Sequence, residues 1–301
     1  MTEQTSDRAK SNSPGATTLG ILSVGICAGP FAHINQFKQM LERTPRDSRA
    51  DTAALEPQTA DIFDRSDRPT IADVATEALK QVAPVATTVA TASRTALLYS
   101  SVWGDIPATH EYLESMLADA GKYASPRAFT RSIYSTAAAM AAIALGIHGP
   151  CQTLSFDFAP VASLLGAAYT LLAADRADVV LLCWADQHSQ MLQELQLLTA
   201  NARLGHTAHR NIQQTLLHGA VAVAVTRCDY ANLMATCTST THCPDEHQMA
   251  TIKLPNDIQQ GHSALRLIAG ALLASNGQGI SWLDGQDRSI CRWVQVTRLA
   301  Q

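Results

Sequence analysis

The sequence predicts an α/β fold in which a mixed, mostly parallel sheet is covered by helices on both faces. Continuous runs of Val, Leu, Ile and Ala at residues 19–26, 178–183 and 219–226 are typical of strands that are buried on both faces. Segments with helical periodicity alternate with these runs, and this alternation favours parallel strands. Two of the helices consist largely of small apolar residues, so we expect them to be buried between layers of the fold.

The composition is that of a globular protein with a large core. The 301 residues are 47% hydrophobic and 16% charged, and the formal net charge is −4. An acidic balance argues against nucleic acid as the main partner. No apolar run reaches the roughly 20 residues of a membrane span, and the polar N-terminus does not resemble a signal peptide. We therefore expect a cytoplasmic protein whose seven widely spaced cysteines are mostly free thiols.

The elements can be placed in order along the chain. Residues 1–17 have almost nothing to bury and are expected to form a disordered tail. Pro69 suits the first turn of a helix that runs to about Val82, with Ser66 or Asp67 as its N-cap. The other expected elements are a strand at 19–26, a helix at 31–41, an exposed loop at 42–64, a strand at 96–102, a helix at 106–120, a helix at 134–146, a strand at 151–155, a helix at 161–173, strands at 178–183, 219–226 and 233–238, a helix at 263–275, and strands near 279–284 and 290–297.

Two helices carry specific expectations about packing. The helix at 134–146 is nearly all Ala, Met, Ile and Leu, which predicts that it is buried on every side at the centre of the molecule. The helix at 161–173 contains Gly166, where we expect a close contact with a neighbouring element.

Four features between Leu97 and Arg227 lie in an order and spacing that resemble the β-ketoacyl synthase family, of thiolase fold. They are Ser125-Pro126 with Phe129, leading into Ile133-Tyr134-Ser135; Gly149-Pro150 followed by Thr153-Leu154-Ser155; Gly166-Ala167-Ala168 followed by Ala177-Asp178; and His218-Gly219-Ala220-Val221. The resemblance implies a thiolase-like, layered α/β/α fold. It divides the chain into a tail at 1–17, a ketosynthase-like domain at 18–230 and an abbreviated C-terminal part at 231–301, packed on the same domain.

The sequence departs from the family at the position of the nucleophilic cysteine, where it carries Phe158. A phenyl ring has no sulfur, oxygen or nitrogen that could attack a thioester. The C-terminal half is also shortened, and Asp257 stands where the family has a lysine before its second histidine, here His262. We therefore expect a condensing-enzyme scaffold without condensing chemistry.

Within the family, these features imply a chain length factor, a subunit that pairs with an active β-ketoacyl synthase in type II polyketide or aryl polyene systems. The implied partners are that synthase and an acyl carrier protein, and no cofactor is implied. The resemblance places the dimer interface at a strand of four residues, Gln152, Thr153, Leu154 and Ser155. Met116, Phe129 and Phe158 are candidates for lining the acyl tunnel.

Two other classes of function stay open. The chain could be an acyltransferase or thioester hydrolase in its own right, with Ser155, Ser263 or His262 as nucleophile or base. It could also bind an acyl group or an acyl carrier protein without a partner synthase. A ketosynthase gene beside this one would favour the subunit over the binding protein.

One cluster invites a metal hypothesis. Cys237, His242, Cys243 and His247 lie within eleven residues, but His242 and Cys243 are adjacent. Neighbours in an extended segment point in opposite directions, so the four side chains cannot easily converge. We expect a surface loop and no metal.

Overall fold

The computed structural model describes residues 16–28, 31–43, 69–118, 122–155, 160–187, 219–240, 263–274, 280–284 and 292–297. Its elements in chain order are β1 (Thr17–Ala28), α1 (Ile34–Arg43), α2 (Ile71–Val89), the 3₁₀ turn η1 (Ala92–Arg94), β2 (Thr95–Ser100), α3 (Ile106–Ala118), α4 (Pro126–Ser132), α5 (Thr136–Leu145), β3 (Cys151–Leu154), α6 (Pro160–Ala173), β4 (Val179–Asp186), β5 (Gly219–Thr226), β6 (Ala235–Thr240), α10 (Ser263–Ala274), β7 (Ile280–Asp284) and β8 (Arg292–Thr297). The element types expected from the sequence are confirmed where they fall on described residues, whereas α4 and η1 were not predicted.

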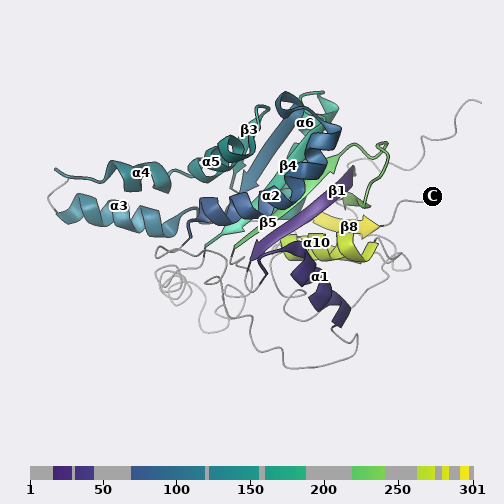
Figure 1. The fold of residues 1–301 in the computed structure, drawn as a ribbon, viewed down its shortest axis with the longest axis horizontal. Helices are drawn as coiled ribbons and strands as arrows, with labels where there is room; N and C mark the ends of the chain where they lie inside the picture. The colour runs from purple at the N-terminus through teal and green to yellow at the C-terminus, as the bar shows by residue number, and fades with distance from the viewer. Residues whose placement is uncertain are drawn as a thin grey trace, which may run out of the picture.

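The strands form one eight-stranded mixed sheet in the order β3-β2-β4-β5-β1-β6-β8-β7 (Figure 1). Only β3 with β2 and β2 with β4 are parallel. The other five neighbouring pairs are antiparallel. The sheet is mixed, as expected, but most of its strand pairs are antiparallel and not parallel. The sequence could not show this, because a strand buried on both faces has the same continuous apolar run in either direction.

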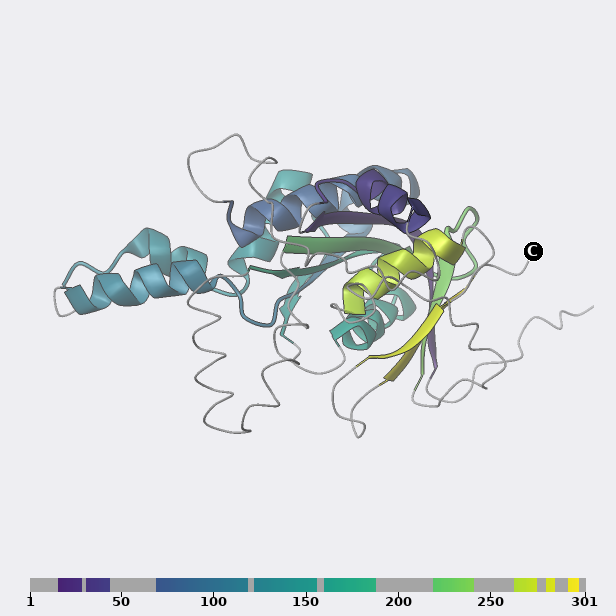
Figure 2. The same ribbon diagram turned by 90° about the horizontal axis from the view of Figure 1, so that it is seen from below.

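Helices cover both faces of the sheet (Figure 2), as predicted. Alternate residues of the central strands divide between the two cores, so that Leu182 and Trp184 point to one face and Leu181 and Cys183 to the other. The first core is completed by α1, α6 and α10, and the second by α2 and α5. The strands after Tyr230 continue the same sheet and do not begin a second one within the described residues.

The expectation that the helix at 134–146 is buried on every side is wrong. Its alanines Ala137, Ala138, Ala141 and Ala142 pack into the core. On the opposite side of α5, the side chain of Met140 is 49% exposed and that of Ile143 is 81% exposed. An all-apolar helix must be covered all round, but the sequence does not say whether the cover comes from the same chain.

Two smaller expectations are also corrected. A Cβ added at Gly166 would meet nothing within 4 Å, so the predicted close contact is absent there. Thr70 is the N-cap of α2, where its hydroxyl accepts the N–H of Asp73 and the Asp73 carboxylate accepts the N–H of Thr70. This helix extends past Val82 and past Pro84 to Val89.

Some expectations lie partly outside the described residues. The expected tail at 1–17 lies outside the described residues up to Gly15. Its last residue, Thr17, is the first residue of β1. The loop at 42–64 overlaps the description only at residues 42 and 43, which end α1. Cys27, Cys151, Cys183 and Cys228 carry free thiols, as expected. Among the helices that are described, none is long and apolar enough to cross a membrane.

Gln81 of α2 connects that helix to the end of β1 and the start of α1. Strand β1 pairs with β6 only from Thr17 to Ile21, so that side of β1 has no strand partner further along. There the Gln81 amide nitrogen donates to the carbonyl of Ile26 (2.8 Å), while its oxygen accepts the N–H of Ile34 (2.9 Å) and of Ile26 (3.3 Å). One side chain thus replaces part of a missing strand.

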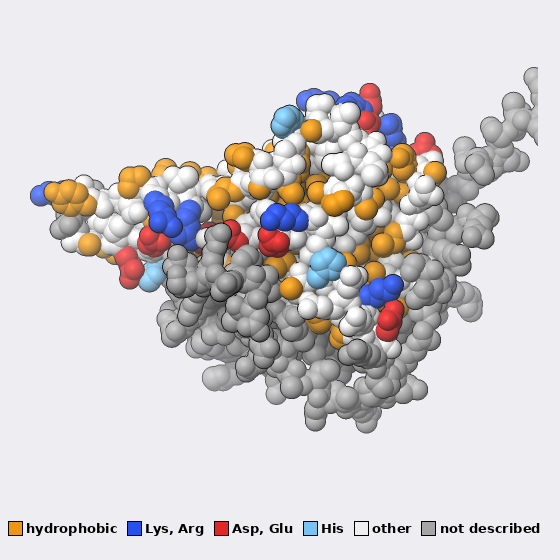
Figure 3. Space-filling model, in the orientation of Figure 1, with side chains coloured by type: hydrophobic (Ala, Val, Ile, Leu, Met, Phe, Trp, Pro, Cys, Tyr) orange, Lys and Arg blue, Asp and Glu red, His pale blue; other side chains and the backbone are white. Residues whose placement is uncertain are grey.

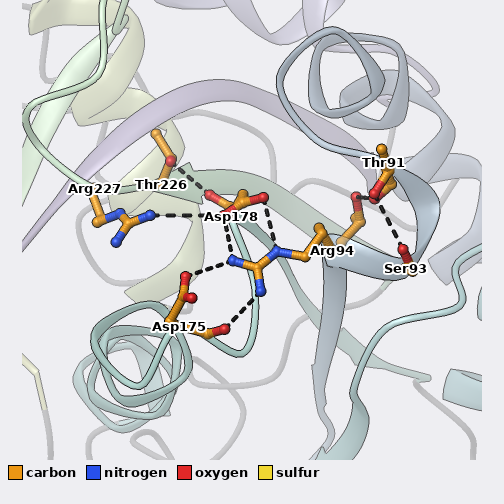
Figure 4. Close-up of polar contacts among 8 residues, drawn as sticks. Thr91, Ser93, Arg94, Asp175, Asp178, Thr226 and Arg227 are labelled. Carbon is orange, nitrogen blue, oxygen red and sulfur yellow. Dashed lines mark hydrogen bonds and ion pairs between the residues drawn. The ribbon is translucent and has the colours of Figure 1, made fainter.

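Ion pairs join the strands at the edge of the sheet where β2 and β4 begin (Figure 4). Arg94, directly before β2, donates to both carboxylate oxygens of Asp178, directly before β4, at 3.0 and 2.7 Å. It also donates to Asp175 at 2.6 Å, and Arg227 lies 3.7 Å from Asp178. The hydrogen bond from Arg94 is the main reason that the pKa of Asp178 is lowered.

Candidate functional site

The candidate site lies at the other end of these strands, where the parallel strands β3, β2 and β4 finish. Ser155 follows β3, Ser101 follows β2, and Asp186 is the last residue of β4. The carboxyl ends of parallel strands meet at one edge, which is where α/β sheets ordinarily bind their ligands. The predicted nucleophile position, Phe158, follows β3 in the sequence but lies outside the described residues.

Asp186 is a buried carboxylate around which the chain after β2 folds. Its Oδ1 accepts the Ser101 hydroxyl at 2.8 Å and the backbone N–H groups of Val102 at 2.9 Å and Trp103 at 3.3 Å. Burial raises the pKa of Asp186 to about 6, although these three hydrogen bonds act in the opposite direction. Desolvation therefore dominates.

The raised pKa of Asp186 predicts a specific dependence of stability on pH. Because the folded protein binds this proton more tightly than the unfolded chain, stability falls as the pH rises from about 4 to about 6. A pKa raised from 3.8 to about 6 corresponds to about 3 kcal/mol. Urea unfolding of the wild-type protein and of Asp186→Asn should show the wild type losing about this much relative to the variant across that window. A difference that stays constant with pH would contradict the assignment.

Tyr134, between α4 and α5, joins three parts of this edge. Its hydroxyl donates to the carbonyl of Val102 at 2.6 Å, and it also forms a hydrogen bond with the Ser155 side chain. Burial raises the pKa of Tyr134. Its ring packs so close to Gly104, which has φ of +68°, that a Cβ there would lie 3.0 Å from it.

These contacts bear on Ser155 as a candidate nucleophile. A serine needs a general base within hydrogen-bond reach. The described partner of Ser155 is the Tyr134 phenol, whose raised pKa keeps it protonated at neutral pH, so that it is no such base. Ser263 begins α10, and His262 lies outside the described residues. Among the residues that the structure describes, Ser155 is thus not paired with a general base.

The helices α3 and α4 form an arm that stands out from the body (Figures 1 and 2). They pack on each other through the rings of Tyr112 and Phe129, whose centroids are 5.2 Å apart. Only Ala108 and Ala128 are buried in them. The arm region therefore exposes several large apolar side chains, which are Leu113, Met116, Leu117, Tyr123, Phe129 and Ile133.

Figure 3 shows hydrophobic side chains along this arm and on the adjoining body. Met116 and Phe129, two of the predicted tunnel residues, are both exposed on the arm. Large contiguous apolar patches on the surface of a single chain are typical of interaction sites.

Strand β3 is one end of the sheet, and it carries the predicted interface residues Gln152, Thr153 and Leu154, with Ser155 following it. The N–H of Leu97 donates to the carbonyl of Pro150 at 2.8 Å. In this parallel register the N–H groups of Gln152 and Leu154 turn toward β2, whereas those of Cys151 and Thr153 point away from the sheet. Helix α5, which exposes Met140 and Ile143, packs beside β3.

The metal hypothesis finds no site in the described part of the chain, where no group of three His, Cys, Asp or Glu side chains is placed to hold an ion. Cys237 lies buried in β6, so the expectation of a surface loop is wrong for this residue. His242, Cys243 and His247 lie outside the described residues.

Sequence reasoning missed the roles of Asp186, Tyr134 and Gln81. Asp186 had a detectable signal, because it is a charged residue at the end of an otherwise apolar strand. Gln81 had none, because its partners are backbone groups 47 to 55 residues away in the sequence.

Comparisons with known proteins agree with this fold. The family model for the β-ketoacyl synthase N-terminal domain matches residues 75–267. No curated protein sequence matches the chain.

Three solved structures are similar over nearly the whole chain. The ishigamide ketosynthase/chain length factor has a TM-score of 0.68 and 14% identity, covering 95% of this chain and 100% of that one. The ketosynthase ApeO in complex with its chain length factor ApeC, from Xenorhabdus doucetiae, has a TM-score of 0.55 and 16% identity, covering 93% and 99%. The AntDE:AntF complex of a type II polyketide synthase acyl-carrier protein with its ketosynthase has a TM-score of 0.64 and 11% identity, covering 94% and 99%. These likenesses show the thiolase-like fold that the sequence predicted.

Proposed function

Since the chain belongs to the family of β-ketoacyl synthase N-terminal domains, we propose that it is a chain-length-factor-type subunit that pairs with an active ketosynthase and shapes the acyl tunnel. The observation that carries this proposal is the uncovered surface made by the arm, the outer face of α5 and the open edge of β3. A partner of the same fold could continue the sheet from β3 and cover the apolar side chains.

The location of this surface supports a role in the reaction without requiring catalysis by this chain. Strand β3 leads directly to Ser155, and the arm carries Met116 and Phe129. A partner bound here would have these side chains beside its own pocket. The loss of the nucleophile at position 158 stays a prediction from the sequence, as do the acyl carrier protein as a further partner and the cytoplasmic location.

A second class of function, an acyltransferase or hydrolase that acts alone, has less support. Its candidate Ser155 is paired with the Tyr134 phenol and not with a base. Incubation of the purified chain with an acyl thioester, followed by intact-mass measurement, would reveal an acylated serine if this alternative were correct.

The test of the proposed function is co-expression with the complete ketosynthase encoded nearest to this gene, followed by native mass measurement. We expect a one-to-one heterodimer. The variant Ile143→Asp should prevent its formation, because it places a charge on the uncovered face of α5. The matched control is Tyr169→Asp, at an exposed aromatic side chain on α6. A homodimer that ignores the ketosynthase, or a heterodimer that tolerates Ile143→Asp, would contradict the proposed interface.

A further inference from the structure

The arm is connected to the body by two short passages of chain that lie side by side. The outgoing passage is Ser101–Asp105, between β2 and α3, and the returning passage is Ile133–Ser135, between α4 and α5. Because α3 and α4 bury so little of their own surface, the direction of the arm depends on how these two passages are held.

Asp186 holds the outgoing passage from inside the body. Three donors from consecutive residues, Ser101, Val102 and Trp103, converge on one of its carboxylate oxygens. The Ser101 hydroxyl in turn accepts the N–H of Gly104 at 2.8 Å. The whole turn from β2 into the arm is therefore wrapped around a single buried carboxylate.

Tyr134 ties the returning passage to the outgoing one. Its hydroxyl donates to the carbonyl of Val102, which lies between two of the groups bound to Asp186, and its ring packs on Gly104. A second link between α4 and the outgoing passage is an ion pair, in which the Arg131 guanidinium lies 3.6 Å from the Asp105 carboxylate. Asp105 also caps α3 by accepting the N–H of Ala108. The hydrogen bond with Ser155 connects the two passages, which together form the root of the arm, to the end of β3.

The carboxylate at position 186 is a costly way to hold a turn. Its side chain is fully buried, and desolvation of the charge outweighs its hydrogen bonds. A residue that lowers stability while it fixes local geometry is expected where that geometry serves a function.

We propose that Asp186 and Tyr134 are positioning residues, which fix the arm relative to the open edge of β3 so that both surfaces meet the same partner subunit. This role rests on the proposed function. Two separate surfaces can bind one rigid partner at full strength only if their relative orientation is set in advance, since otherwise binding must order the arm.

The main test is Tyr134→Phe, which retains the ring over Gly104 and removes only the hydroxyl that links Val102 and Ser155. The isolated subunit should keep its urea midpoint, because Tyr134 is partly exposed, but amides of residues 101–105 and 126–135 should exchange hydrogen faster. Binding to the ketosynthase should weaken by about tenfold. Asp186→Asn is the second variant, with faster exchange at 101–105 expected. Tyr169→Phe, at an exposed tyrosine on α6, is the control and should change neither readout.

The outcomes separate this role from the proposed function. A wild-type chain that does not bind the ketosynthase would overturn the proposed function and this role with it. A wild-type chain that binds, together with a Tyr134→Phe variant that binds equally tightly, would overturn the positioning role alone. Faster exchange at the arm root without weaker binding would also overturn it, because it would show that the orientation of the arm does not matter to the partner.

Discussion

Replacing Thr153 with proline is expected to abolish stable association with the ketosynthase while the subunit itself stays folded. The N–H of Thr153 points away from β2 toward the open edge, as the register with β2 requires. Proline at this position removes a donor that a pairing strand would use and leaves the ladder between β3 and β2 intact. It also places the pyrrolidine ring in the path of an incoming strand.

The matched control for this variant is Thr153→Val, which keeps the N–H. The Thr153 hydroxyl is buried without a hydrogen-bond partner, so an apolar replacement of similar shape should not destabilise the fold. Size-exclusion chromatography with light scattering on the co-expressed proteins should show the heterodimer for Thr153→Val and separate subunits for Thr153→Pro. An intact complex with Thr153→Pro would move the interface away from β3.

The substitution Gln81→Leu is expected to lower the free energy of unfolding by about 3 kcal/mol. Leucine fills a similar volume, but it removes the partners of Ile26 N–H and C=O, of Ile34 N–H and of the Ala32 carbonyl. Partly buried backbone groups without partners are destabilising by about 1–3 kcal/mol each, less what water recovers. The measurement is urea unfolding followed by circular dichroism.

Gln36→Leu serves as the comparison for Gln81→Leu. The Gln36 side chain also accepts two backbone N–H groups, those of Ala32 and His33, but on an exposed turn where water can replace it. We expect a loss of about 1 kcal/mol or less. Equal losses for the two glutamines would show that Gln81 does not act as a substitute for a missing strand.

The sequence predicted the type and approximate bounds of most described elements because these depend on local patterns, but it missed α4. Strand β5 was placed at its observed bounds, since an unbroken run of alternating Ala and Val has few alternatives to a buried strand. The end of α5 was clear for a similar reason, because Gly146 adopts the left-handed conformation that closes the helix. By contrast, the N-cap of α2 was misplaced, because several residues before Ile71 could cap a helix and only the geometry of Thr70 and Asp73 distinguishes them.

What the sequence by itself determined was most of the elements, the α/β class and the family to which the chain belongs, since these follow from periodicity, composition and motif spacing. Only the tertiary structure decided the direction of the strands, because buried runs are the same in both directions. Only the tertiary structure revealed that half of α5 is uncovered, because an apolar helix has the same sequence whether its cover is this chain or another. The same holds for the arm root, where Asp186, Ser101 and Tyr134 meet although 33 to 85 residues separate them, and no local pattern records such a meeting.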